Sequence, residues 1–183
     1  MAQTPKIEPL AGKSFGLIAD AHIHPGKGPV LPARVADIFS GVDAIIALGD
    51  LGEAAGLDAL EKIAPVIGVT GADDALGDPR IVGEARLFAI GDLTVGAVFD
   101  GVKQALFSSS DPLVPVADFS QAVARRFGRG LDVLLCASTH TPVVAWVAGI
   151  LIVNPGSPTL ADATTLAVLH IDGSVARVAH VSL

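Results

Sequence analysis

Short apolar runs that end at acidic residues or histidines constrain this chain more than any other feature of its sequence. Segments 14–19, 44–48 and 66–69 are typical of buried strands, and segments 31–39 and 56–63 between them carry apolar residues at helical spacing. Strands that alternate with helices predict parallel strands joined by crossover helices. The first part of the chain therefore indicates an α/β fold.

Hairpins dominate the rest of the sequence. Apolar segments pair around short turns at 86–90 with 93–99, at 143–148 with 150–153, and at 165–171 with 174–181. A helix within 116–127 and a buried strand over 132–136 are expected between them. We predict one α/β domain over residues 1–183, built as a two-sheet sandwich flanked by helices, with residues 1–13 loosely ordered.

Composition narrows the classes of function. The net charge of -7 argues against a broad nucleic-acid surface. The longest apolar stretch, 143–153, falls short of the ~20 residues that span a membrane, so no membrane association is expected. Cys136 is the single cysteine and no signal peptide is recognisable, which favours the cytoplasm. The apolar C-terminal hairpins could form an interface in a homo-oligomer.

The residues that follow the apolar runs are the candidates for chemistry. They are Asp20 and His22, Gly49 and Asp50, Gly71 with Asp73 and Asp74, Asp100, and Ser138 with His140. Because ligands of such folds bind beyond the carboxyl ends of the strands, we expect these residues to meet at one edge. Carboxylate oxygen and neutral imidazole nitrogen bind Mn, Fe, Ni or Zn, so the pattern predicts a divalent-metal site.

Four short motifs, in the order in which they occur, resemble those of a known family. Asp20-Ala21-His22, Gly49-Asp50, Thr139-His140 and Asn154-Pro155-Gly156-Ser157 together resemble the calcineurin-like metallophosphoesterases, in particular their small single-domain bacterial and archaeal phosphodiesterases. The retromer scaffold subunit of eukaryotes is similar to the same branch. The resemblance runs from about residue 14 to the C-terminus. It implies the fold of that family and hydrolysis of phosphate esters by a metal-bound hydroxide.

The resemblance also implies the metal ligands. By analogy with that family, the first metal of the site would be held by Asp20, His22, Asp50 and His140. The second metal would use Asp50 and the positions of Ala72, Asp100 and Ser138, and the last three residues depart from the family's pattern. Two interpretations stay open: a single ion with four protein ligands, or a second, oxygen-rich site rebuilt by Asp100 and Asp73. We expect one divalent ion, Mn, Ni, Fe or Zn, with two as the alternative.

Other residues near these motifs have secondary roles. Asp73 occupies a position where the family often has a histidine that assists the leaving group, which makes it a catalytic candidate, although a nearby cation would oppose its protonation. The alternative for Asp73, as for Asp74, is the commoner role of a simple turn former. His24 is expected near the rim of the site. Site-shaping roles are expected for Gly49, Gly71, Asp74, Ser138 and Asn154.

Three hypotheses of function follow. The first is a divalent-metal-dependent phosphoesterase, acting on small phosphomonoesters or phosphodiesters through a remodelled, mononuclear site. The alternative is a catalytically weak or inactive member of the family that serves as a binding or scaffold protein. A third is a metal-dependent hydrolase of another bond. Metal-dependent hydrolysis lost in Asp50→Asn would favour the first, and metal binding without turnover the second.

Overall fold

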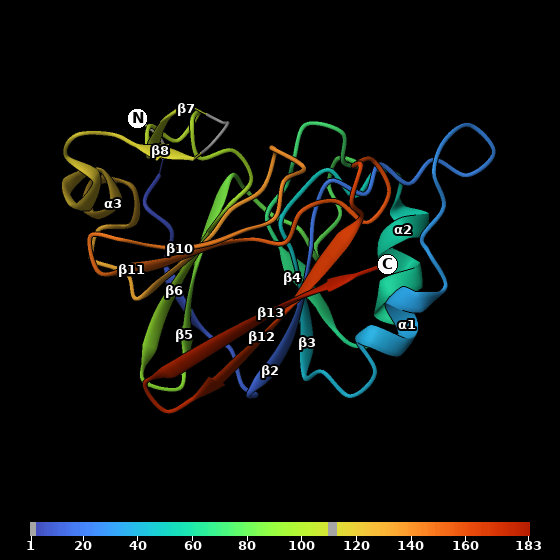
Figure 1. Cartoon of the computed structure of the whole chain (residues 1–183), viewed down its shortest axis with the longest axis horizontal. Coiled ribbons are helices and arrows are strands. Elements are labelled where there is room, and N and C mark those ends of the chain that lie inside the picture. Colours follow the sequence, from blue (N-terminus) through green and yellow to red (C-terminus); the bar gives the residue numbers. More distant parts are fainter. Residues whose placement is uncertain (1–2, 110–112) are drawn as a thin grey trace.

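Two β-sheets packed face to face form the centre of the computed structural model, which describes residues 3–109 and 113–183 (Figure 1). The six-stranded sheet has the order β1 (Ile7–Pro9), β5 (Ala85–Ile90), β6 (Leu93–Val98), β9 (Val133–Leu135), β11 (Ile150–Asn154) and β10 (Val143–Val147). The five-stranded sheet has the order β13 (Val175–Ser182), β12 (Thr165–Asp172), β2 (Ser14–Ile18), β3 (Ala44–Ala47) and β4 (Val66–Gly68). A small two-stranded antiparallel sheet is formed by β7 (Phe107–Ser109) and β8 (Val114–Pro115). The predicted α/β two-sheet sandwich is confirmed.

Helices cover the outer faces of both sheets. The crossover connections of the parallel strands β2, β3 and β4 contain α1 (Arg34–Ile38) and α2 (Ala54–Glu61), as the alternating pattern predicted. The third helix, α3 (Phe119–Phe127), buries Phe119, Ala122, Val123 and Phe127, a helical stripe that packs on the six-stranded sheet. No helix in the described part of the chain is long and apolar enough to cross a membrane.

The main core lies between the sheets. Phe15 and Leu17 on β2 and Leu169 on β12 point from one sheet toward Phe88 on β5 and Val95 on β6 of the other, and all five side chains are buried. Alternate residues of each strand face this layer because successive side chains of a strand point to opposite faces. The packed layer fixes the two sheets, and hence the loops at their ends, relative to each other.

The N-terminal segment differs from the sequence-based expectation that residues 1–13 are loosely ordered. Residues 7–9 form β1, which pairs parallel with β5. The guanidinium of Arg86, which is 8% exposed, donates to both carboxylate oxygens of Glu8, with Nε–Oε1 at 3.1 Å and Nη2–Oε2 at 2.5 Å. This forked, charge-assisted contact joins residues far apart in the sequence, so local pattern could not reveal it.

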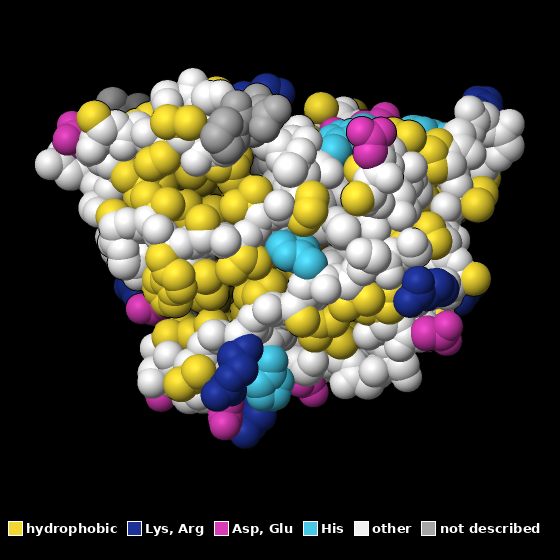
Figure 2. All heavy atoms as spheres, in the orientation of Figure 1, with side chains coloured by type: hydrophobic (Ala, Val, Ile, Leu, Met, Phe, Trp, Pro, Cys, Tyr) yellow, Lys and Arg dark blue, Asp and Glu magenta, His cyan; other side chains and the backbone are white. Residues whose placement is uncertain are grey.

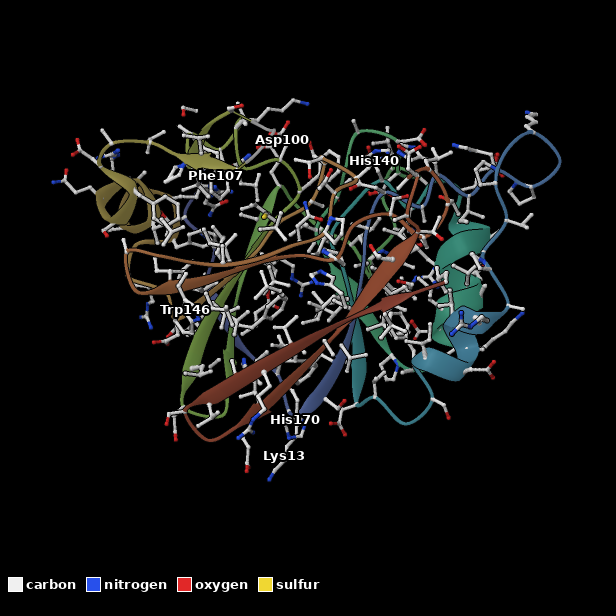
Figure 3. The ribbon with its side chains drawn as sticks, viewed as in Figure 1. Lys13, Asp100, Phe107, His140, Trp146 and His170 are labelled. Atoms are coloured by element: carbon white, nitrogen blue, oxygen red, sulfur yellow. The ribbon has the colours of Figure 1, made fainter. Side chains whose placement is uncertain are left out.

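The two ends of the sandwich differ in character. Figure 3 shows His140 and Asp100 at one end, and Lys13 and His170 at the opposite end. Carboxylate and histidine side chains gather along the upper edge of the face in Figure 2, whereas hydrophobic side chains gather over the β10–β11 side. On β10, Trp146 is 68% exposed. The strand ends predicted to carry chemistry therefore meet at one end of the molecule.

Candidate metal centre

The backbone of the site residues leaves the strands in a strained conformation. Asp20, His22, Asp50, Ser138 and His140 all have positive φ, between 46° and 73°. They are five of the seven non-glycine residues with positive φ in the described part of the chain. Such conformations cost roughly 1–3 kcal/mol each, persist only where the surroundings fix them, and concentrate at functional sites.

Hydrogen bonds from two loops fix the turn after β2. The backbone N–H groups of Asp20 and His22 donate to the carbonyls of Gly49 and Asp50, at 3.0 and 2.9 Å. The hydroxyl of Ser157, which is fully buried, donates to the carbonyl of Asp20 at 2.7 Å. Thr159 Oγ1 donates to the carbonyl of Ala21, also at 2.7 Å. The loop after β11 thus braces the turn that presents Asp20 and His22.

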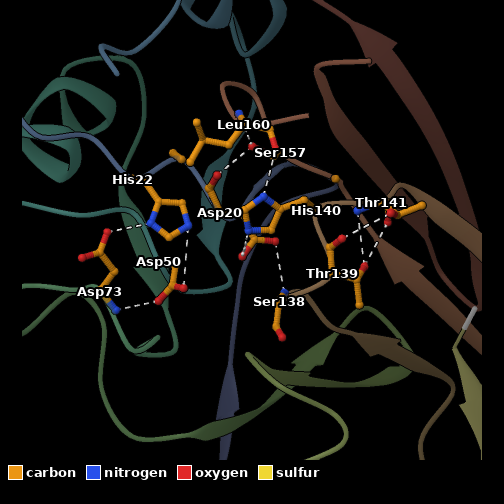
Figure 4. Close-up of polar contacts among 12 residues, drawn as sticks. Asp20, His22, Asp50, Asp73, Ser138, Thr139, His140, Thr141, Ser157 and Leu160 are labelled. Atoms are coloured by element: carbon orange, nitrogen blue, oxygen red, sulfur yellow. Dashed lines mark hydrogen bonds and ion pairs between the residues drawn. The ribbon is translucent and has the colours of Figure 1, made fainter. Parts of the chain in front are cut away.

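Three side chains from two strand ends converge in Figure 4. Asp20, His22 and His140 each offer one ligand atom, and these atoms all lie within 4.8 Å of one another. Nδ1 of His140 donates to the carbonyl of Leu160 at 3.0 Å. Because a carbonyl oxygen can only accept, this nitrogen carries the proton of the neutral ring, and Nε2 keeps its lone pair. Nε2 of His140 lies 3.8 Å from Oδ1 of Asp20.

His22 is held in the same manner on the other side of the site. Its Nδ1 is 2.6 Å from Oδ2 of Asp73, so Nε2 faces Asp50, whose Oδ2 is 3.8 Å away. The other oxygen of Asp50 accepts the backbone N–H of Asp73 at 2.7 Å. The four residues predicted as ligands of the first metal are therefore brought together, with Asp50 beside the group of three.

One buried carboxylate oxygen at the centre of the site has no hydrogen-bond partner in the described part of the chain. Among the described residues, Oδ1 of Asp20 has no hydrogen bond, whereas its Oδ2 accepts the backbone N–H of Ser138 at 3.1 Å. Burial raises the pKa of Asp20 to about 6, although the nearby His140 opposes the rise. A buried carboxylate oxygen without a partner is costly, and a cation would remove that cost. This oxygen and two imidazole Nε2 atoms form a donor set that fits Mn, Fe, Ni or Zn.

Asp74 ties the loops after β3 and β4 together. Its buried carboxylate accepts the backbone N–H groups of Asp50, Leu51, Gly52 and Gly71, at 3.0, 2.6, 3.2 and 2.6 Å. Burial raises the pKa of Asp74, and these four hydrogen bonds oppose the rise. The carboxylate thus sets the backbone position of Asp50.

Two glycines allow these loops to approach each other closely. A Cβ on Gly71 would lie 2.3 Å from both the backbone nitrogen and Oδ1 of Asp50. Gly49 has a φ of 101°, and a Cβ there would lie 2.7 Å from the Phe99 ring and 2.8 Å from the nitrogen of Gly71. Any side chain at either position would therefore displace the Asp50 loop.

The residues considered for a second metal are engaged in other contacts. Oδ1 of Asp100 accepts the backbone N–H groups of Val102 and Lys103, at 2.9 and 3.0 Å, and its Oδ2 lies 3.9 Å from Nζ of Lys103. Oδ2 of Asp73 contacts both His22 and Nε2 of His24, the latter at 2.8 Å. These bonds, that from His24 foremost, hold the pKa of Asp73 below its ordinary value, so it is an ionised acceptor.

A cavity of about 240 Å³ lies beside this second group. Gly71, Ala72, Phe99, Asp100 and Lys103 contribute to its lining. Gly71 connects the cavity with the site, because it packs directly against Oδ1 of Asp50. A larger hollow of about 490 Å³, near Lys6, Arg86 and Arg126, contains none of the predicted ligands.

Some contacts of the site were not anticipated from the sequence. Thr159 and Leu160 support Ala21 and His140 through one hydroxyl and one carbonyl, and no motif marks either residue. His24, expected only near the rim, contacts Asp73 directly. Asn154 forms the expected turn, with Oδ1 accepting the N–H of Gly156 at 2.9 Å and Nδ2 donating to Thr139 Oγ1 at 3.0 Å.

Comparisons with known proteins show which family the chain is related to. Residues 14–174 match the family model described as the calcineurin-like phosphoesterase superfamily domain. A probable metallophosphoesterase of Methanocaldococcus jannaschii is 35% identical over 148 residues, which cover 80% of this chain and 68% of that protein. A probable metallophosphoesterase of Methanothermobacter thermautotrophicus is 34% identical over 164 residues, 87% of this chain and 86% of that protein.

The fold has close structural counterparts as well. The crystal structure of Vps29 from Chaetomium thermophilum superimposes with a TM-score of 0.70 at 20% identity, over 93% of this chain and 97% of that one. This likeness concerns the fold. The family match spans most of the sequence and includes every strand end that carries a predicted ligand. The chain therefore belongs to the calcineurin-like phosphoesterase superfamily.

Proposed function

We propose that this protein is a divalent-metal-dependent phosphoesterase whose site is remodelled to hold one ion. The observation that carries the proposal is the buried Oδ1 of Asp20, which has no hydrogen-bond partner among the described residues and lies 3.8 Å from Nε2 of His140. A scaffold without a ligand here would gain stability from an uncharged side chain in place of this carboxylate. A charged aspartate at position 20 therefore fits a site that binds a cation.

Four side chains would hold the ion. His22 and His140 would contribute their Nε2 atoms, because Nδ1 of each ring is engaged by Asp73 or by the carbonyl of Leu160. Asp20 and Asp50 would supply carboxylate oxygens and neutralise the charge of a divalent ion. When bound, such an ion supplies Lewis-acid stabilisation of a phosphoryl oxygen and an activated water.

The departures at the second-metal positions support a mononuclear site. Ala72 has no ligand atom in its side chain, and the carboxylate of Asp100 caps the backbone of its own turn. The ammonium of Lys103 lies 3.9 Å from Oδ2 of Asp100, so a positive charge already accompanies that carboxylate. We infer that the cavity lined by Ala72, Phe99 and Lys103 receives a substituent of a small phosphate ester.

Metal content and turnover test the proposal together. The full chain would be loaded with Mn²⁺ or Ni²⁺, dialysed and analysed for metal, then assayed with p-nitrophenyl phosphate and bis(p-nitrophenyl) phosphate. We expect about one ion per chain and hydrolysis that a chelator abolishes. In Asp50→Asn we expect hydrolysis to be lost, and in Asp20→Ala both ion and hydrolysis. Wild-type protein that retains no ion would overturn the proposal.

A second candidate function is a binding or scaffold role. It is favoured by the exposed apolar side chains of β10, where Val144 is 48% and Trp146 68% exposed. It is also consistent with the Vps29-like fold. Retention of one ion without cleavage of any phosphate ester would favour this role over catalysis. Cleavage of a different ester or amide under the same conditions would instead favour another metal-dependent hydrolase.

A further inference from the structure

We propose that Asp73 is a positioning residue that fixes two ligands of the metal site at once, His22 through its side chain and Asp50 through its backbone. The inference rests on the proposed function, because it concerns the affinity of the same site for its ion. It differs from the sequence-based expectations for residue 73, which were a second-metal ligand, a proton donor or a simple turn former.

The side chain of Asp73 meets imidazoles rather than the backbone amides that a turn-forming aspartate contacts. One oxygen, Oδ2, lies 2.6 Å from Nδ1 of His22 and 2.8 Å from Nε2 of His24. Figure 4 shows Asp73 on the side of the His22 ring away from Asp20 and His140. A carboxylate that accepts from Nδ1 holds the ring in the tautomer whose Nε2 keeps its lone pair, and it fixes the direction of that lone pair.

The backbone of the same residue acts on a second predicted ligand, Asp50. The N–H of Asp73 donates to Oδ1 of Asp50 at 2.7 Å, which leaves Oδ2 of Asp50 directed toward Nε2 of His22 at 3.8 Å. His22 follows β2 and Asp50 follows β3, so one residue after β4 couples ligands from two neighbouring strand ends. A change in the position of residue 73 would move both.

His24 makes a further contact that holds the Asp73 side chain. Its Nε2 contacts Asp73, and its Nδ1 lies 3.6 Å from Oε1 of Glu53. The two carboxylates hold this ring in place, and the ring in turn limits the rotation of the Asp73 side chain, whose relative exposure is 37%. With two N–H groups on a single oxygen, Asp73 is committed to orienting histidines, and a role as a second-metal ligand would require these bonds to break.

The test compares Mn²⁺ binding by calorimetry in the wild type, Asp73→Ala and Asp73→Asn. Asp37→Asn, which changes an exposed aspartate of α1, serves as the matched control. We expect Asp73→Ala to weaken Mn²⁺ binding by about 10- to 100-fold, the usual effect of losing a partner of a ligating histidine. Asp73→Asn, which keeps one acceptor oxygen, should recover part of the loss, and Asp37→Asn should bind as the wild type does.

A spectroscopic measurement keeps the inference independent of activity. Long-range ¹H–¹⁵N correlation spectra of the metal-free protein report which ring nitrogen of each histidine carries the proton, and His22→Ala assigns the signals. We expect His22 to be protonated at Nδ1 in the wild type and to become a mixture of tautomers in Asp73→Ala, with His140 unchanged because Leu160 holds it.

The outcomes separate this inference from the proposed function. Unchanged Mn²⁺ affinity and an unchanged His22 tautomer in Asp73→Ala would overturn the inference while leaving a metal site intact. Two ions per wild-type chain and one in Asp73→Ala would overturn it too, by making Asp73 a ligand. If the wild type bound no metal, the proposed function would fail, yet the tautomer measurement would still support or overturn the positioning role.

Discussion

Ser157 lies 137 positions after Asp20 in the sequence, yet its hydroxyl donates to the carbonyl of Asp20 at 2.7 Å. The same hydroxyl oxygen accepts the backbone N–H groups of Thr159 and Leu160, at 3.2 and 2.9 Å. One fully buried side chain thus fixes the positive-φ conformation of Asp20 and orders the loop that carries the carbonyl partner of His140.

We expect Ser157→Ala to lower the free energy of unfolding by about 1–3 kcal/mol, because it leaves two donors and one acceptor of a partly buried turn without their partner. Metal affinity should fall as well, since Asp20 and the Leu160 carbonyl would both lose support. Urea unfolding and Mn²⁺ titration measure the two effects. Ser40→Ala, at an exposed serine, is the control and should change neither. Equal stability of the two variants would contradict this role for Ser157.

Gly71 is expected to tolerate no side chain. Gly71→Ala would place a Cβ 2.3 Å from the nitrogen and Oδ1 of Asp50, so the Asp50 loop would have to shift. We expect a loss of stability of about 1–3 kcal/mol, as is typical of overpacking, together with weaker metal binding. In Gly130→Ala the added methyl group would meet no atom within 4 Å, so this control should be neutral. Thermal unfolding with and without Mn²⁺ would show both effects.

Asp100 provides the sharpest test of metal number. Asp100→Asn keeps an oxygen that can cap Val102 and Lys103, but it removes a carboxylate that could bind an ion. We expect the variant to retain about one ion per chain, as the wild type does, by elemental analysis after loading and dialysis. A wild type with about two ions and a variant with one would establish a two-ion site and exclude the mononuclear proposal.

The convergence of the predicted ligands could be anticipated from sequence because they follow apolar strands. Asp20, Asp50 and His140 each come shortly after a segment whose pattern already indicates a buried strand, and parallel packing brings such ends together. The contacts that set their orientation could not be anticipated in the same way. Leu160 acts through a carbonyl group that every residue carries, so nothing in its identity reveals the partnership with His140.

The fold, like the site, could be predicted where local sequence pattern determines it and not where contacts between distant residues do. Long apolar runs and turn dipeptides indicated the sheets, the crossover helices and the three hairpins, because burial follows from local pattern. Strand β1 escaped prediction because three residues show little alternation and depend on distant partners, including the contact of Glu8 with Arg86. Likewise, Trp146 is apolar in type but exposed, which composition alone cannot reveal.

The buried carboxylate of Asp20 predicts an unusual dependence of stability on pH in the metal-free protein. Its pKa is raised from 3.8 to about 6 by burial, so between these values the folded state binds a proton that the unfolded state has released. The free energy of unfolding should therefore fall as pH rises from about 4 to about 6, by on the order of 3 kcal/mol from this group.

Because other carboxylates titrate in the same range, the measured quantity is the difference between the wild type and Asp20→Asn in urea unfolding with a chelator present. We expect the variant to be the more stable protein near pH 7 and to lose this advantage near pH 4. Saturating Mn²⁺ should reverse the order at pH 7, since an ion bound to the folded state stabilises the wild type by mass action. A wild type that is more stable than Asp20→Asn at pH 7 without metal would show that Oδ1 of Asp20 has a partner other than a cation.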